Sequence, residues 1–285
     1  MYDQATRLRM IAESQEEIQP GATMRPGVPL FQRANIPYPV RTIAITSGKG
    51  GVGKTNIAAN LGIAIAAQNK RVGIIDADLG LANIDVILKL KPRYNIEHVI
   101  AGRKTMEDIF VSGPAGLTII PAGSGRLSLA NLPELDRDRL IRKLMECTSD
   151  FDIMFIDTAA GISSNVMDFA LTAQEIIVIT TPEPTAITDA YAMIKVISQQ
   201  RKADIGIIVN MVDNPRQAGN VADRIIMAAR RHINANAHFM GHILTDAAVS
   251  DAIFAQQPLV FKYPESSAAQ CINVLANKIL NNGKK

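Results

Sequence analysis

One stretch, Ser47 to Asn56, constrains the fold more than any other part of this 285-residue chain. It reads SGKGGVGKTN and lies between a strand-like apolar run, residues 41–46, and an alanine-rich helical pattern, residues 57–67. Its glycines and its final Gly-Lys-Thr satisfy GxxxxGK[ST], the spacing of a phosphate-binding loop, in the strand–turn–helix context that this loop requires. We therefore predict that the phosphates of a nucleotide bind at this turn.

The residue types in the loop match the chemistry of phosphate binding. Backbone N–H groups of a glycine-rich turn can point inward, and the N-terminus of the following helix favours an anion. Lys54 supplies a positive charge for the outer phosphates, and the hydroxyl of Thr55 is a ligand for Mg²⁺. The predicted nucleotide-binding residues of the loop are Gly48, Lys49, Gly50, Gly51, Val52, Gly53, Lys54, Thr55 and Asn56.

Two further strand-like runs end in aspartates that would complete such a site. Residues 71–75 lead to Asp76 and Asp78, and residues 153–156 lead to Asp157. Because the carboxyl ends of parallel strands open onto the ligand crevice of an α/β sheet, we expect these carboxylates to face the loop. A lone aspartate after a strand is often only a turn former or a helix cap, so the combination with the loop is what favours a Mg²⁺ site.

From residue 41 onward, apolar strand-like runs alternate with helical patterns. This alternation predicts an α/β fold in which a mostly parallel central sheet has helices on both faces. An insertion with small helices is expected at 84–116. The remaining predicted strands are 117–121, 175–181, 205–209 and 239–244, and the remaining predicted helices are 135–145, 222–232 and a C-terminal helix. Thr185 or Thr188 is expected to cap the helix that follows 175–181.

Composition and charge exclude several classes of protein. There is no run of about 18 apolar residues, so no segment is expected to span a bilayer. The net charge of +3 is too small to indicate a nucleic-acid partner, and none is expected. Cys147 and Cys271 lie far apart, which argues against a disulfide framework or a zinc site and suits a reducing cytoplasm. The charged N-terminus does not read as a signal peptide.

A second lysine, Lys49, follows the first glycine of the loop, and KGGVGKT resembles the deviant phosphate loop of the MinD/ParA family of ATPases. The resemblance implies a P-loop NTPase fold, ATP and Mg²⁺ as cofactors, and an ATP-dependent homodimer in which Lys49 reaches the partner's phosphates. From the residue alone, a solvated loop cation is the alternative for Lys49, so its role across the dimer rests on the resemblance. DADLGLAN, residues 76–83, resembles the first switch of that family. The implied roles are catalysis for Lys49, Lys54 and Asp78, and Mg²⁺ binding for Thr55, Asp76 and Asp157, with Asn83 a weaker candidate in the same loop.

Two residues near the ends of later strands are candidates for contacts with the base. The family uses an asparagine after the strand at 205–209, which implies this role for Asn210; a plain turn asparagine is the alternative. Asp246 lies in a turn that resembles the family's turn beside the base. Leu244 and Thr245 depart from the family pattern there, so the resemblance supports Asp246 less strongly.

Three segments narrow the resemblance to the flagellar-number regulators of the FlhG/FleN group: DQATRLR at 3–9, DTAAGI at 157–162 and PEPTAITDAYA at 182–192. In that group the DQAxxLR segment stimulates the GTPase FlhF, which implies an FlhF-type partner here. A transcription activator of the FleQ type is the second implied partner. The partner-binding residues would be Asp3, Gln4, Ala5, Leu8 and Arg9.

We predict three parts of the chain: a partner-binding helix at 1–18, a Pro- and Gly-rich linker at 19–39, and an ATPase domain at 40–285. The competing functions are a cell-division MinD and a DNA-partitioning ATPase of the ParA type. The C-terminal helix places one apolar face toward the sheet, and packing is favoured over weak membrane contact. We thus expect a cytoplasmic protein, with peripheral contact at the inner face of the membrane as the alternative. That face comprises Ala268, Ile272, Leu275, Ala276 and Ile279.

Overall fold

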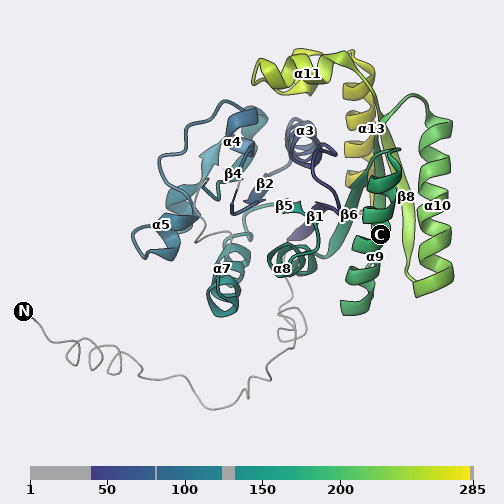
Figure 1. Cartoon of the computed structure of the whole chain (residues 1–285). Coiled ribbons are helices and arrows are strands. Elements are labelled where there is room, and N and C mark those ends of the chain that lie inside the picture. The colour runs from purple at the N-terminus through teal and green to yellow at the C-terminus, as the bar shows by residue number, and fades with distance from the viewer. Residues whose placement is uncertain (1–39, 81, 124–131, 283–285) are drawn as a thin grey trace, which may run out of the picture.

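The computed structural model describes residues 40–80, 82–123 and 132–282 (Figure 1). The helix and linker predicted for 1–18 and 19–39 lie outside the described residues, as do the five predicted partner-binding residues.

The described strands form one eight-stranded sheet with the order β3-β4-β2-β5-β1-β6-β7-β8. All neighbouring strands are parallel except β3 and β4, so the predicted mostly parallel sheet is confirmed. The short antiparallel strand β3 at the edge was not predicted. The strands are β1 (Arg41–Ser47), β2 (Val72–Ala77), β3 (Val111–Ser112), β4 (Thr118–Ile120), β5 (Ile153–Ala160), β6 (Glu175–Thr180), β7 (Ile205–Val212) and β8 (Ala237–Leu244).

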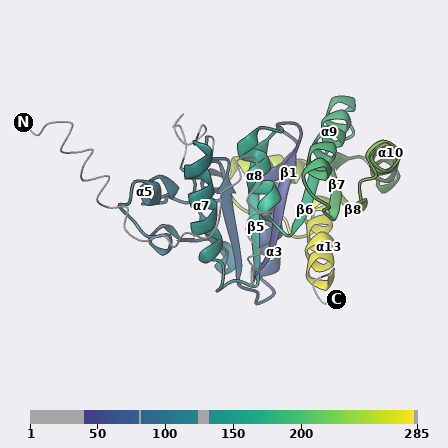
Figure 2. The same ribbon diagram turned by 90° about the horizontal axis from the view of Figure 1, so that it is seen from below.

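Helices cover both faces of this sheet, and each face has its own hydrophobic core. Figure 2 shows α3 and α13 on one side and α8 and α9 on the other. The small helices predicted within 84–116 are present. The helices are α3 (Lys54–Ala66), α4 (Ile84–Ile87), α5 (Ile96–Ile100), α7 (Glu134–Glu146), α8 (Ser164–Thr172), α9 (Pro184–Gln200), α10 (Pro215–Ile233), α11 (Ala247–Phe254), α12 (Leu259–Lys262) and α13 (Ser267–Asn282), with 3₁₀ turns η1 (Glu107–Ile109) and η2 (Pro114–Gly116).

The position of β1 in the sheet determines where a ligand can bind. β1 pairs with β5 on one side and with β6 on the other, and its side chains are buried on both faces. The chain runs from β1 to β2 and back through β5, and then continues to β6, β7 and β8 on the opposite side. A ligand crevice is expected outside the carboxyl ends of the strands where the strand order reverses in this way. The predicted phosphate loop follows β1 at this point.

Three strands extend past the carboxyl ends of their predicted apolar runs and include a candidate site residue. β2 includes Asp76, β5 includes Asp157 and β7 includes Asn210. Asp76 pairs in register with Asp157, because the backbone ladder between β2 and β5 continues past the last apolar side chains. Asp76 and Asp157 are therefore held by regular pairing of β2 with β5 rather than by loops.

The C-terminal helix packs on the domain. All five residues of its predicted apolar face are buried, and α13 contacts α3 and β8. Lys278 extends this packing, because its Nζ donates a hydrogen bond to the carbonyl oxygen of Met240 at 2.8 Å. None of the described helices combines the length and apolarity needed to cross a bilayer.

Replacing Leu275 tests this packing. Leu275 is 1% exposed, so we expect Leu275→Ala to lower the free energy of unfolding by about 2–5 kcal/mol, measured by urea denaturation. The control is its neighbour Val274, which is 67% exposed; Val274→Ala should change stability by less than about 0.5 kcal/mol. Equal effects of the two substitutions would contradict the docking of α13 on the sheet.

Candidate functional site

The backbone of the loop requires glycine at two positions for different reasons. Gly53 has a left-handed conformation, φ 90°, directly before α3. Gly48 lies against the start of α9, where an added Cβ would approach the carbonyl oxygen of Asp189 to 2.2 Å. The loop is thus closed by the first residues of α3 and backed by α9, and its amides are placed at the N-terminus of a helix, where anions bind favourably.

Lys54, the first residue of α3, is a buried cation between acidic side chains. Its exposed fraction is 8%. Burial lowers the pKa of Lys54, while the nearby charges of Asp157 and Asp78 oppose that effect. The structure therefore brings together the loop lysine and two of the three predicted carboxylates, which arrive from β5 and from the loop after β2.

Asp76 organises the first switch segment. Its buried carboxylate accepts backbone hydrogen bonds from Asp78 at 3.3 Å, Asn83 at 3.1 Å and Ile84 at 3.3 Å. Burial nevertheless raises the pKa of Asp76 to about 7. A ligand that changes the charge or position of this carboxylate would act on the loop and on the first turn of α4 at once.

Asp157 is the least satisfied polar side chain of the site. It is 1% exposed, and neither carboxylate oxygen accepts a hydrogen bond of normal geometry from the described residues. Burial raises the pKa of Asp157 to about 8, the adjacent charge of Asp76 adds to the rise, and the nearby Thr55 hydroxyl and Lys54 charge oppose it. A buried polar group without a partner calls for an explanation, and an ion is one of the standard ones.

These residues fit Mg²⁺. Asp76, Asp157 and the Thr55 hydroxyl offer hard oxygen ligands, and the two orphaned oxygens of Asp157 have no other role among the described residues. No group of three or more His, Cys, Asp or Glu side chains in the described ranges is arranged to hold a metal. A site with two carboxylates and one hydroxyl suits Mg²⁺, because this ion usually keeps several waters and binds through one or two carboxylates together with substrate phosphates.

Lys49 is held within its own chain. Its Nζ contacts Glu183 Oε1 at 2.5 Å and Thr185 Oγ1 at 2.8 Å. This lysine also lowers the pKa of Glu183. The prediction that Thr185 or Thr188 caps α9 is wrong, because Glu183 is the N-cap residue and no side chain caps the helix. Thr185 instead accepts a hydrogen bond from Lys49. No local pattern in the sequence indicated Glu183 as the partner of this lysine.

The two candidates for base contacts have different surroundings. Asn210 Nδ2 donates a hydrogen bond to the carbonyl oxygen of Val52 at 2.8 Å, so this asparagine braces the phosphate loop. Asp246 caps α11 by accepting from the Ala248 amide at 2.9 Å, and its other oxygen accepts from the Ala268 amide at 3.2 Å. A contact of either residue with a base stays a prediction.

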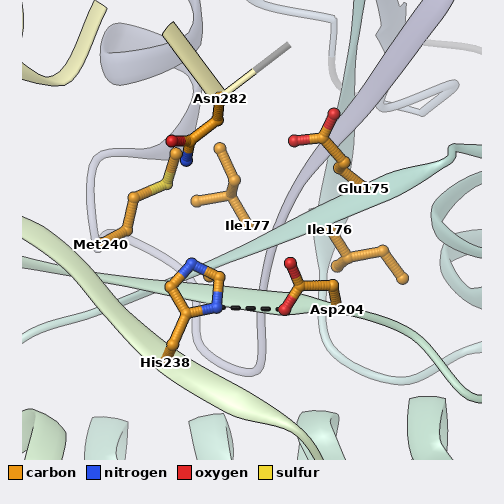
Figure 3. A pocket seen from close by; sticks show the side chains of 8 residues that line it. Glu175, Ile176, Ile177, Asp204, His238, Met240 and Asn282 are labelled. Atoms are coloured by element: carbon orange, nitrogen blue, oxygen red, sulfur yellow. Dashed lines mark hydrogen bonds and ion pairs between the residues drawn. The ribbon is translucent and has the colours of Figure 1, made fainter. Parts of the chain in front are cut away.

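A separate cavity lies at the amino-terminal ends of the strands, and Figure 3 shows the side chains that line it. Its volume is about 320 Å³, and it is lined by residues from the amino-terminal ends of β6, β7 and β8, among them Glu175 and Gly206. His238 Nδ1 lies 3.1 Å from Asp204 Oδ1 on its wall. Because the phosphate loop follows the carboxyl end of β1, this cavity does not belong to the nucleotide site.

The two raised carboxyl pKa values predict how stability depends on pH. In the unfolded chain both carboxyls lose their protons near pH 4, whereas Asp76 and Asp157 hold them up to about pH 7 and 8 in the fold. Between these limits the folded state binds more protons, so stability falls as pH rises. We expect Asp157→Asn to flatten this fall and to raise the melting temperature at pH 8 in EDTA.

The control for this measurement is Asp152→Asn. Hydrogen bonds from Arg71 lower the pKa of the exposed Asp152 carboxyl, so its contribution changes only below about pH 4. Thermal unfolding of both variants from pH 5 to 8 separates the two cases. If the stability of Asp157→Asn falls with rising pH as steeply as that of the unmodified chain, the burial of this carboxyl does not set the pH dependence.

Comparison with known proteins agrees with this geometry. The chain is 37% identical over 243 residues to the antiactivator FleN of Pseudomonas aeruginosa, covering 85% of this chain and 87% of FleN. It is 34% identical over 241 residues to the flagellum site-determining protein YlxH of Helicobacter pylori, covering 84% and 81%. The crystal structure of the cell division ATPase MinD of Pyrococcus furiosus superposes with a TM-score of 0.73 at 26% identity, covering 85% and 99%.

A second solved structure, MinD of Pyrococcus horikoshii in complex with Mg-ADP, has a TM-score of 0.73 at 25% identity and covers 86% and 98% of the two chains. The profile of the CobQ/CobB/MinD/ParA nucleotide binding domain matches residues 43–259, which include the phosphate loop and all three carboxylates. The chain therefore belongs to the CobQ/CobB/MinD/ParA family of nucleotide-binding proteins.

Proposed function

We propose that this chain is a Mg²⁺-dependent ATPase that dimerises on binding ATP and regulates the number and placement of flagella. The observation that carries the ATPase assignment is the orphaned carboxylate of Asp157 buried beside Asp76 and Lys54 at the phosphate loop. The flagellar assignment is supported by similarity to FleN and to YlxH, whose names describe an antiactivator and a flagellum site-determining protein.

The reaction is attack of water on the γ-phosphate of ATP, which releases ADP and phosphate. Such a reaction needs an in-line water and cations that neutralise the phosphate charge, and it needs little covalent chemistry from the protein. Lys54 stabilises the charge on the transferred group, and Asp78 orients the water. Asp76, Asp157 and Thr55 would hold Mg²⁺, which would supply further positive charge to balance the phosphates. The first switch segment is bonded to Asp76, so binding and hydrolysis change its position.

Lys49 couples nucleotide binding to dimerisation. In the single chain its charge is balanced by Glu183, whose side chain is 56% exposed, against 33% for Lys49. Exposed ion pairs contribute little to stability, so a triphosphate can compete for the lysine. When ATP binds, Lys49 leaves Glu183 and reaches the phosphates bound by the second copy. The ligand-free chain is then the monomeric state of the switch.

An Asp78→Ala variant tests the switch. Loss of the residue that orients the water should slow phosphate release by at least about tenfold and trap an ATP-bound dimer, detected by light scattering with ATP and Mg²⁺. The matched control is Lys49→Ala, which should bind ATP and remain monomeric because the contact across the interface is removed. An Asp78→Ala protein that stays monomeric with ATP would refute the proposed coupling.

The proposed partners are an FlhF-type GTPase and a transcription activator of the FleQ type. The first is supported by DQATRLR at residues 3–9, and the second by similarity to an antiactivator. A cell-division MinD is the second candidate, supported by the solved MinD structures. The burial of the apolar face of α13 favours the flagellar assignment, since that face is not available to a membrane. The net charge of +3 gives no support to ParA-type DNA binding.

The partner assignment is tested at Leu8. Leu8→Asp places a charge in the DQAxxLR segment, and we expect it to abolish stimulation of the cognate FlhF-type GTPase while Mg-ATP binding is unchanged. The control is Glu16→Gln, outside the segment, which should stimulate as the unmodified chain does. GTP hydrolysis by the partner is the measured quantity. Full stimulation by Leu8→Asp would remove this segment from the proposed interface.

A further inference from the structure

The carboxyl end of β7 contains a bulge next to the site. Val209 pairs with His242 and Val212 pairs with Leu244, so two residues, Asn210 and Met211, oppose Ile243 alone. Met211 has a left-handed backbone conformation with φ 56°. Bulges are frequent beside active sites, where they redirect a side chain.

Because of the bulge, the side chains of Asn210 and Met211 point in different directions. Val209 and Val212 belong to the same hydrophobic core although they are three residues apart; in a regular strand they would face opposite sides of the sheet. With the extra residue, the Asn210 side chain reaches the phosphate loop. Met211 is turned outward, is 46% exposed and belongs to neither core of the described residues.

The left-handed backbone of Met211 is unusual for its position. The other five described non-glycine residues with positive φ are Asn69, Lys89, Ala115, Asn234 and Gln256. Four of them follow the ends of helices and Ala115 lies in a 3₁₀ turn. Met211 alone among these six lies within a strand. Strained residues of this kind persist where the surroundings impose them, and they cluster at ligand sites.

A nucleotide bound as proposed would extend across the sheet toward Met211. The carboxylates that would hold Mg²⁺, and through it the terminal phosphates, come from β2 and β5, on one side of β1. The opposite end of a nucleotide held by the loop must then extend toward β6, β7 and β8. At that end the Thr245 amide donates to the carbonyl oxygen of Val212 at 2.9 Å, which holds the turn before α11 against the bulge. Met211 lies in the chain between Val212, which contacts this turn, and Asn210, which contacts the phosphate loop.

We propose that Met211 forms one wall of the base site, where its thioether side chain packs on the face of the purine ring. The inference rests on the proposed ATP binding and adds a residue to that site. Methionine suits this role because its side chain is flexible and its sulfur makes favourable contacts with aromatic rings. It offers no hydrogen-bond donor, so the contact strengthens the binding of adenine and guanine nucleotides by the same factor.

The test measures the affinity of the full-length protein for Mg-ATP and for Mg-tripolyphosphate, which has no base, together with the melting temperature. Met211→Gly removes the side chain and relieves the strain; Ala115→Gly relieves the same φ of 56° in η2, away from the carboxyl edge. Both variants should melt at a higher temperature. Met211→Gly alone should weaken Mg-ATP binding, by about two- to tenfold, with tripolyphosphate binding unchanged, and Met211→Leu should retain most of the affinity.

Each other result overturns a distinct statement. Wild-type affinity of Met211→Gly for Mg-ATP would refute the base contact and leave the ATPase assignment intact. Weaker binding of tripolyphosphate by Met211→Gly would show that the residue acts through the phosphate loop rather than on the base. Failure of the unmodified chain to bind either ligand would overturn the proposed function and this inference together.

Discussion

Asp76 and Asp157 are buried side by side at the carboxyl ends of neighbouring strands, and the rest of the site depends on how their charge is balanced. Burial raises both carboxyl pKa values, so the ligand-free fold favours the protonated forms. Three backbone amides, the buried Lys54 and the Thr55 hydroxyl surround the pair. A Mg²⁺ ion with its nucleotide would supply the positive charge that this arrangement lacks, which makes ligand binding and the conformation of the first switch segment interdependent.

The order of the strands assigns a different task to each side of β1. On the β5 and β2 side lie the carboxylates that would hold the metal ion, and through it the terminal phosphates. On the β6 and β7 side lie Glu183, which holds Lys49, and Asn210, which braces the loop through Val52. In the proposed function, a nucleotide that spans both sides would contact Lys54, the carboxylates and the elements that hold Lys49 and the loop. The sheet would then link nucleotide binding to the surface where a second copy would dock.

The packing of α13 bears on the choice between the flagellar and the cell-division function. In α13 the apolar face is filled by the contacts with α3 and β8, and Lys278 is bonded to the backbone of β8. The helix thereby completes a core of the domain. In the proposed function, other parts of the protein therefore determine where it acts, namely the N-terminal segment and the ATP-dependent dimer.

The phosphate loop, the aspartates, the alternating strands and helices and the apolar face of α13 could be predicted from the sequence, because each is a local pattern with a fixed spacing. Four features arise only in the folded chain: the pairing of Lys49 with Glu183, the hydrogen bond from Asn210 to Val52, the burial that leaves Asp157 without a partner among the described residues, and the bulge that exposes Met211. These features join residues about 100 or more positions apart or depend on strand register. They follow from the order of strands in the sheet, and a local pattern of residue types does not encode that order.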